Sequence, residues 1–309
     1  MAALLIALGV ALLYVGGELL VKNAALLARA VGLSPLVVGL TVVAFGTSAP
    51  ELAATLAAAL KGTPEVAFGN VVGSNAANLG LILSLAALIQ PIRAQARFLR
   101  QELPFMVAVA VLLVVLAADG RVTRAEGALL LFLLFLYLFV LLRDREPPEV
   151  EAEFAAEFGR PARYALRRLC FLALGVVFLA GGSSALVEGA VRIARELGVA
   201  ERAIGLTVVA VGTSLPELAA AIVAALRREG DILLGNVVGS NVFNVLGILG
   251  TVALVRPLAL RPGVGPDLLG MLALSFVAWL FLWTGMRLGR REAAVLLVFY
   301  VFYVAVAFS

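Results

Sequence analysis

The chain has 309 residues, of which 63% are hydrophobic and only 14% charged, whereas charged residues make up about a quarter of a typical soluble domain. This composition excludes a soluble protein and predicts an integral membrane protein. One cysteine and no histidine exclude a disulfide framework and a thiolate or imidazole metal site, and we ascribe the net charge of +4 to arginine in loops rather than to a nucleic-acid-binding face.

Ten stretches with few or no charges follow one another along the chain. A helix that crosses the hydrocarbon core of a bilayer needs about 20 apolar residues, so each stretch predicts one span of an all-α membrane protein. We expect Glu18, Lys22 and Glu188 to break the first and sixth spans, with roles at the membrane interface or in helix movement rather than as ion ligands. The predicted spans are 2–21, 30–60, 66–92, 103–118, 127–142, 169–187, 203–226, 232–255, 268–286 and 293–309.

The chain contains an internal duplication at a shift of 166 residues. Residues 39–54, GLTVVAFGTSAPELAA, match residues 205–220 at 14 of 16 positions, and GNVVGSN occurs at both 69–75 and 235–241. The repeated motifs extend over 39–80 and 205–246, within halves 1–143 and 167–309 that are joined by a linker, 144–166. Each half holds five predicted spans, and this odd number makes the second half enter the membrane from the opposite side. The sequence therefore predicts two inverted five-helix repeats, an architecture typical of transporters.

Loop charges predict the orientation in the membrane. If the amino terminus lies outside, fifteen arginines fall in the inside loops and eight lysine or arginine residues in the outside loops. Because positive charge is enriched on the cytoplasmic side, we expect both termini outside and the linker in the cytoplasm.

The second predicted span contains GTSAPE, an unusual polar stretch in an apolar run. Pro50 has no N–H and its ring crowds the carbonyl of Gly46, so backbone oxygens there should lose their helical partners. Such free carbonyls are tolerated in a membrane only where they are buried in protein or line a hydrated cavity. Thr47 and Glu51 stand four residues apart, with Ser48 beside them, so hydroxyl and carboxylate share one face.

The seventh predicted span repeats this arrangement with Thr213, Ser214, Pro216 and Glu217. The predicted inversion brings the two sets face to face near the middle of the membrane. A buried glutamate costs about 2.5–3.5 kcal/mol there unless it has a partner, and neither span contains lysine or arginine at this depth. Two carboxylates among hydroxyls and free carbonyls predict a site for a hard cation, Ca²⁺ or Na⁺.

The spans that follow carry a polar stripe with a period of four residues. Such a stripe should face the interior of the bundle. Its glycine pairs, 69/73 and 235/239, should let this helix approach the glutamate-bearing helix closely. Asn70 and Asn236 either touch the ion or bridge helices, and the spacing favours neither. The stripe consists of Asn70, Ser74 and Asn78 in the first half and of Asn236, Ser240 and Asn244 in the second.

The paired GTSAPE and GTSLPE, together with the paired GNVVGSN, resemble the two alpha repeats of the cation/calcium antiporter superfamily, in particular its sodium/calcium exchanger branch. The resemblance covers the chain apart from the linker. It implies overlapping Ca²⁺ and Na⁺ sites that open alternately to the two sides as the first and sixth spans slide. Some relatives carry aspartate where this chain has Asn244, which puts potassium co-transport in doubt. The ligands implied are Thr47, Ser48, Glu51 and Ser74, Thr213, Ser214, Glu217 and Ser240, the backbone oxygens of Ala44 and Ala210, and Asn78 and Asn244 near the centre.

The glutamates and hydroxyls could instead be structural. Glu51 and Glu217 could belong to a buried hydrogen-bond network, and the hydroxyls could bond back to the preceding helical turn. The duplication with identical neighbours and the lack of a cationic partner favour the ion site in both cases. The six carboxylates at 144–157 match no 12-residue calcium loop, so we expect a solvated connector.

We therefore expect an antiporter in the plasma membrane, working as a monomer without a cofactor, that exchanges Ca²⁺ for Na⁺. The alternative is an H⁺/Ca²⁺ antiporter, in which the buried glutamates carry protons. An intramembrane hydrolase lacks a histidine base, and hydroxyl groups beside both glutamates suit coordination better than proton transfer. A channel lined by the same oxygens is disfavoured, although flux without a counter-ion would revive it.

Overall fold

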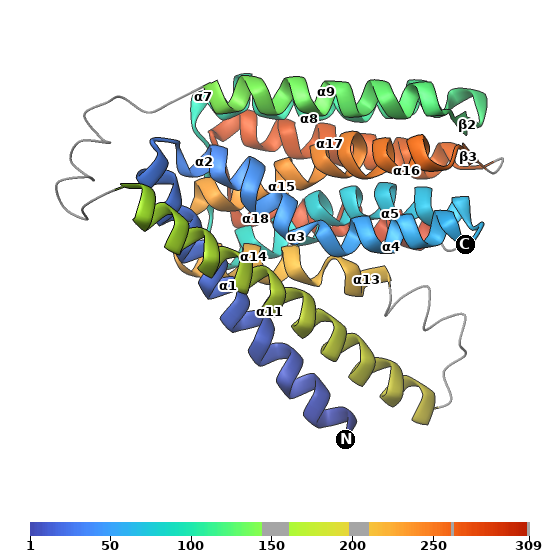
Figure 1. The fold of residues 1–309 in the computed structure, drawn as a ribbon. Helices are drawn as coiled ribbons and strands as arrows, with labels where there is room; N and C mark the ends of the chain where they lie inside the picture. Colours follow the sequence, from blue (N-terminus) through green and yellow to red (C-terminus); the bar gives the residue numbers. More distant parts are fainter. Residues whose placement is uncertain (144–160, 198–209, 261–262, 308–309) are drawn as a thin grey trace.

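The computed structural model describes residues 1–143, 161–197, 210–260 and 263–307, which form a helical bundle (Figure 1). In the first half the helices are α1 (Ala2–Val31), α2 (Pro35–Val38), η1 (Gly39–Val43), α3 (Ala44–Thr47), α4 (Ala49–Leu60), α5 (Pro64–Ala77), η2 (Asn78–Ile82), α6 (Leu83–Ile89), α7 (Ala96–Arg100), α8 (Glu102–Leu116), η3 (Ala117–Asp119) and α9 (Arg124–Arg143). In the second half they are α11 (Pro161–Glu196), α13 (Ala210–Thr213), α14 (Leu215–Leu226), α15 (Gly230–Phe243), η5 (Asn244–Leu249), α16 (Gly250–Val255), α17 (Gly265–Gly285) and α18 (Arg290–Ala307).

Seven helices of the described residues are long and apolar enough to cross a membrane, and an eighth forms if the bent pair of 35–47 and 49–60 counts as one. The other two predicted spans correspond to α14, of only 12 residues, and to α18. The residues before α13, including the first five of the motif at 205–246, lie outside the described residues, as does most of the predicted linker.

The expectation that Glu18, Lys22 and Glu188 break the first and sixth helices is wrong. Helix α1 runs through the first two and ends only at Gly32, whose φ of 66° forms a left-handed cap, and α11 continues to Glu196. A charge lowers the local hydropathy but leaves the backbone hydrogen bonds intact, whereas a left-handed cap ends the helix. Glu188 is moreover satisfied by its own helix, since it accepts a hydrogen bond from Arg192 at 2.7 Å.

Helices α1 and α11 lie side by side and run in opposite directions along one face of the bundle (Figure 1). Close packing depends on glycine at both crossings. A side chain at Gly9 would come within 2.8 Å of the Gly182 carbonyl oxygen, and one at Gly16 would come equally close to that of Gly175. The two helices thus touch through backbone at these crossings.

Four two-residue strands form two ribbons, which an all-α expectation did not include. Strand β1 (Ile92–Arg93) pairs antiparallel with β4 (Arg287–Leu288), and β2 (Arg121–Val122) pairs likewise with β3 (Leu258–Ala259). Strands β1 and β2 precede and follow α8, so the ribbons lie at its two ends. Each ribbon ties the first half of the chain to the second.

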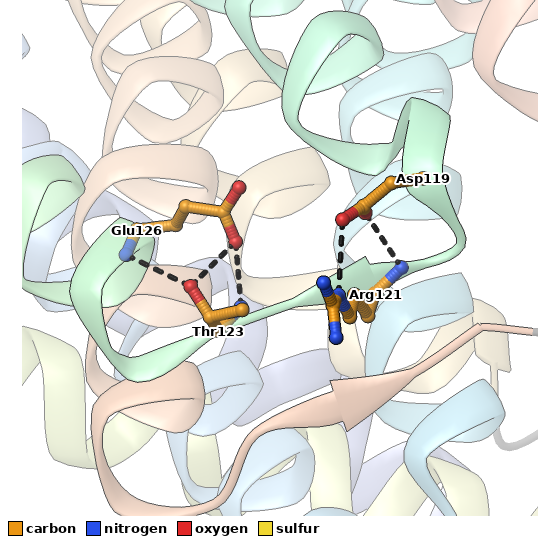
Figure 2. Close-up of polar contacts among 4 residues, drawn as sticks. All are labelled: Asp119, Arg121, Thr123 and Glu126. Atoms are coloured by element: carbon orange, nitrogen blue, oxygen red, sulfur yellow. Dashed lines mark hydrogen bonds and ion pairs between the residues drawn. The ribbon is translucent and has the colours of Figure 1, made fainter.

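Beside the second ribbon, local polar contacts set the start of α9 (Figure 2). The Thr123 hydroxyl lies 3.3 Å from the backbone N–H of Glu126, and the Glu126 carboxylate accepts from the backbone N–H of Thr123 at 2.7 Å. This is a capping box, which satisfies two otherwise unpaired helix donors. Arg121 folds back onto Asp119 at 3.0 Å.

The centre of the bundle is formed by the two spans that carry GNVVGSN. Of the most apolar window of 230–255, 83% is buried, against 28% for α9 and α11. The outer helices therefore present apolar side chains to lipid, while the polar stripes lie inside. Each of these central spans also contains a π-helical segment, η2 or η5, and a third, η1, precedes the bend at Ser48.

Candidate cation-binding site

The two glutamates of the repeated motif lie in the first turns of α4 and α14, each directly after a break in the helix. Ser48, with φ −85° and ψ 4°, separates α3 from α4, and Ser214 separates α13 from α14 with nearly the same angles. Proline follows two residues later in each copy and fits the first turn of the new helix. Glu51 and Glu217 are 1% and 2% exposed, and each stands at a helix N-terminus, whose partial positive charge stabilises a carboxylate.

The serines at the two breaks cross over to the opposite half. The Ser48 hydroxyl donates to Glu217 Oε1 at 2.9 Å and lies 3.0 Å from Ser240 Oγ. Ser214 lies 3.4 Å from Ser74 Oγ and within hydrogen-bonding reach of Glu51, which in turn lies close enough to interact with Glu217. The structure therefore brings both predicted carboxylates and all four predicted serines together, because each helix break faces the polar stripe of the other half.

The threonines of the motif contact the asparagines whose role the sequence left open. Thr47 Oγ1 lies 3.0 Å from Asn236 Oδ1, and Thr213 Oγ1 lies 3.5 Å from Asn70 Oδ1. Asn70 also donates to the Thr55 hydroxyl at 2.8 Å. These contacts favour the bridging role, since each asparagine joins a stripe helix to a broken helix.

Asn78 and Asn244 each open a π-helical segment, and both are 1% exposed. Their side-chain amides donate across the halves, Asn78 to Asn241 Oδ1 at 3.3 Å and Asn244 to Asn75 Oδ1 at 3.0 Å. A π-helical segment shifts the register of the side chains that follow it and often marks a functional site. Each amide stands one turn after Ser74 or Ser240, on the same helix face.

Four buried side-chain oxygens in this cluster have no hydrogen-bond partner in the described part of the chain: Glu51 Oε2, Glu217 Oε2, Asn78 Oδ1 and Asn244 Oδ1. Within the described residues, no arginine or lysine forms an ion pair with either glutamate, and no group of three acidic, histidine or cysteine residues occurs. Unpaired oxygen atoms are costly in an apolar interior. Two carboxylates with neutral oxygens around them form a donor set suited to a hard cation.

The backbone oxygens implied as ligands are engaged or only partly described. The Ala44 carbonyl accepts the backbone N–H of Ser48 at 3.0 Å and lies 3.3 Å from the Thr47 hydroxyl, which leaves it little free lone-pair capacity. Ala210 begins α13, directly after residues outside the described part. The carbonyl of Gly212, which stands four residues before Pro216, accepts a hydrogen bond from Ser183 at 2.5 Å. In this copy the oxygen released by proline is thus satisfied by a side chain of α11.

One of the predicted glycine pairs packs as expected. A side chain at Gly235 would come within 2.6 Å of the Leu36 carbonyl oxygen, and one at Gly239 within 2.5 Å of that of Leu40. Both contacts are with the broken helix that carries Glu51, so the close approach joins the two halves. No described atom lies within 4 Å of the corresponding points at 69 and 73, and their equivalent neighbours fall at 202–209, outside the described residues.

The site contacts are reciprocal. Equivalent residues of the two halves differ by 166 in number. When each residue is replaced by its equivalent, the Thr47–Asn236 contact becomes Thr213–Asn70, and the Ser48–Ser240 contact becomes Ser214–Ser74. The two ribbons exchange in the same way, because Ile92 pairs with Leu288 as Val122 pairs with Leu258. The crossings of α1 and α11 do so too. The two halves therefore meet through the same surface of each.

Sequence reasoning missed Asn75 and Asn241. They lie one position after the serine of the stripe, and the stripe contains only residues at every fourth position, so it did not include them. The available signal was the identity of GNVVGSN in both copies, which includes them. Thr55 and Ser183 have no polar counterpart at the equivalent positions, Ala221 and Gly17, and so gave no signal in the repeat.

Comparison with known proteins shows similarity over nearly the whole chain. The family model described as sodium/calcium exchanger protein matches residues 1–143 and 168–309. The inner membrane protein YrbG of Escherichia coli is 35% identical, with 96% of this chain and 93% of the relative aligned. The sodium/calcium exchanger MaX1 of Methanosarcina acetivorans is 33% identical over 99% of this chain and 98% of the relative.

A solved structure is similar in fold as well. The sodium-calcium exchanger NCX_Mj, soaked with 10 mM Na⁺ and zero Ca²⁺, superposes with a TM-score of 0.88 at 30% sequence identity, covering 98% of each chain. The likeness extends over both halves.

Proposed function

Since this chain belongs to the sodium/calcium exchanger protein family, we propose that it is a secondary active antiporter that exchanges Ca²⁺ for Na⁺ across the cell membrane by alternating access. The observation that carries this proposal is the pair Glu51 and Glu217, buried and in reach of each other, with four unpartnered oxygens in the same cluster. One divalent cation neutralises the two carboxylates. Without it, each charged carboxylate in the apolar interior would cost roughly several kcal/mol.

The ligands in this proposal are the ten side chains that the sequence predicted. The glutamates, serines and asparagines 78 and 244 offer their oxygens directly. Thr47 and Thr213 each contact an asparagine of the opposite stripe, and in this proposal their hydroxyl oxygens join the ligand set. The Ala44 and Ala210 carbonyls complete the set as backbone ligands, the Ala44 carbonyl by binding the ion in place of the Thr47 hydroxyl that lies 3.3 Å from it.

Exchange follows from competition for the same two carboxylates. Ca²⁺ neutralises both at once, whereas Na⁺ ions would occupy neighbouring positions among the hydroxyl and amide oxygens. Binding of Ca²⁺ therefore excludes binding of Na⁺, and the reverse. A site occupied by either ion can open to the other side of the membrane, whereas the empty site, with its charged carboxylates, cannot. The glycine-lined contact of α1 with α11 provides the surface along which these helices slide.

The proposed architecture is ten transmembrane helices in two inverted five-helix repeats, with both termini outside and the linker in the cytoplasm. The reciprocal contacts and the opposite directions of the equivalent helices α1 and α11 support inversion, and the loop charges support the orientation. Both carboxylates come from one chain, which supports a functional monomer.

Single-cysteine labelling tests the topology. In a Cys170→Ser background, a cysteine in the linker and one at the carboxyl terminus should react with a membrane-impermeant reagent from opposite sides of the membrane. Reaction of both from one side would exclude the five-plus-five arrangement. Cys170 is the only cysteine in the chain, so the background is free of thiols.

Reconstituted vesicles test the driving ion. Vesicles loaded with Na⁺, with K⁺ or with a proton gradient alone are diluted into ⁴⁵Ca²⁺. We expect rapid uptake only with internal Na⁺, undiminished when K⁺ is omitted. Uptake driven by the proton gradient alone would assign the function to an H⁺/Ca²⁺ antiporter, and uptake without any counter-ion would indicate a channel.

A further inference from the structure

We propose that Asn75 and Asn241 are positioning residues that turn the amide oxygens, rather than the NH₂ groups, of Asn244 and Asn78 toward the cation. The inference rests on the proposed function, because it concerns the same site. The geometry is a chain of hydrogen bonds through four asparagines, 75, 78, 241 and 244, two from each half, all at most 4% exposed. Asn75 Oδ1 accepts from Asn244, and Asn241 Oδ1 accepts from Asn78.

An asparagine needs such orientation because its amide has two unlike edges of almost the same size. One edge is an acceptor that attracts a cation, and the other is a donor that repels it. If Asn244 rotated by half a turn, its oxygen would face Asn75 Oδ1, acceptor against acceptor. The hydrogen bond therefore selects one of two orientations that are sterically equivalent, and it leaves Asn244 Oδ1 as one of the unpartnered oxygens of the cluster.

The orienting residues are themselves held. Asn75 donates to the backbone carbonyl of Asn241 at 3.2 Å, so a rotation of its own amide would set its oxygen against this carbonyl and its NH₂ group against that of Asn244. Asn241 donates to the Met106 sulfur at 3.5 Å, which is a weak acceptor. We therefore expect the loss of Asn75 to release Asn244 completely, and Asn241 to be the less firmly held of the two.

Removal of the acceptor at 75 should weaken cation binding without disturbing the helix. Asn75→Leu keeps the size of the side chain but leaves the Asn244 amide free to rotate, so the NH₂ edge faces the ion part of the time. Groups that orient metal ligands typically affect affinity by about 10- to 100-fold when they are removed. We expect Asn75→Leu to lower the affinity for Ca²⁺ by a factor in this range. Asn241→Leu should also lower it, by releasing the amide of Asn78.

A double-mutant cycle separates orientation from packing. An aspartate at 244 has two equivalent oxygens and needs no orientation, so Asn75→Leu should change Ca²⁺ affinity by no more than about twofold in the Asn244→Asp background. Asn241 orients the other amide, that of Asn78. Asn241→Leu should therefore keep its full effect on Ca²⁺ affinity in that background, which makes it the matched control. Affinity is measured as the Ca²⁺-dependent, and separately the Na⁺-dependent, rise in the thermal unfolding midpoint of the purified protein.

The unfolding midpoint without ions reports whether each variant is folded, and Asn75→Ala, which also lacks the acceptor, replaces Asn75→Leu if that variant fails. An equal loss in both backgrounds, or no loss in either, overturns the inference while leaving the proposed exchange intact. If neither ion raises the midpoint of the unsubstituted protein, the proposed function and the inference both fall. Ca²⁺ binding with proton-driven transport would contradict only the driving ion.

Discussion

The two halves of the molecule are nearly identical at their centre and differ at its edge. The contacts of Thr47 with Asn236, of Ser48 with Ser240 and of Asn78 with Asn241 each have a counterpart with exchanged partners. One turn further along the glutamate-bearing helices the match ends, because Thr55 in α4 corresponds to Ala221 in α14. The cluster therefore requires the same groups twice, whereas the surrounding helices do not.

The difference at the edge has a physical cost. Asn70 donates to Thr55, whose hydroxyl donates in turn to the Glu51 carbonyl at 2.6 Å. With alanine at 221, the equivalent amide nitrogen, Asn236 Nδ2, is buried without a partner among the residues that the structure describes. An unpaired donor beside the cluster therefore does not by itself indicate a ligand site, since this one follows from a missing hydroxyl in the second half.

The largest expected effect comes from the central carboxylates. Glu51→Gln and Glu217→Gln should each abolish Ca²⁺ exchange in proteoliposomes, because an amide supplies one neutral oxygen where a divalent ion needs compensating charge. If the halves are equivalent at the centre, the two variants should fail equally. Near-normal exchange by either one would make that glutamate structural.

Glu102→Gln is the matched control. Glu102 is also a buried carboxylate, 5% exposed, but it accepts a hydrogen bond from Tyr137 at 3.0 Å and is not among the proposed ligands. We expect this variant to retain exchange. Equal loss in all three variants would indicate a general effect of neutralising buried acids.

A third acid at the centre should change selectivity rather than abolish transport. Asn244→Asp places another carboxylate close to Glu51 and Glu217, so protons should compete with cations more strongly and exchange should become more sensitive to pH. Asn78→Asp is the equivalent change in the first half and should have a similar effect. Exchange is measured over a pH series at fixed Na⁺; a profile unchanged in both variants would place these amides outside the site.

The sequence predicted the central elements well because the constraint there is local. The duplication and the GTS and GNVVGSN stretches indicated which helices meet, and both glutamates and all four serines lie where the spacing required. The positions of Glu51 and Glu217 could be predicted because they depend only on their own helices and on the proline that breaks each helix.

Other features could not be predicted, because they depend on contacts between halves. The partner of Glu18 is Arg227, 209 residues away, and the contacts of Asn75 and Asn241 also join the two halves. The π-helical segments change the register by one residue without any sequence signature. Hydropathy averaged along one helix reports none of these contacts.

The missing hydroxyl in the second half predicts a smaller, stabilising effect. Ala221→Thr should supply an acceptor to Asn236 as Thr55 does to Asn70, and should be more stable than Ala221→Val by about 1–2 kcal/mol. Valine has the size of threonine without the hydroxyl, so the comparison removes the cost of added volume. The measurement is the thermal unfolding midpoint without ions, and equal midpoints would show that Asn236 does not meet the new hydroxyl.

The smallest expected effect lies where the halves differ in charge. Arg227, at the end of the helix that carries Glu217, forms an ion pair with Glu18 of α1. The pair is partly exposed, so it should contribute about 0.2–1 kcal/mol, less at high salt. If it holds α1 in the arrangement seen here, Glu18→Gln should change the ratio of the two access states by a factor of up to about five, measured as labelling of a cysteine accessible from one side only.

The equivalent positions in the other half make this prediction directional. Ser184 stands where α1 has Glu18, and Lys61 of the first half stands where α14 ends in Arg227, so the equivalent pair has its cation but lacks the acid. In an inverted repeat the two access states exchange the conformations of the halves. Ser184→Glu should therefore form its ion pair in the opposite state and shift the labelling ratio in the opposite direction from the native pair. A shift in the same direction would show that the added charge acts through the general potential and not through a contact between helices.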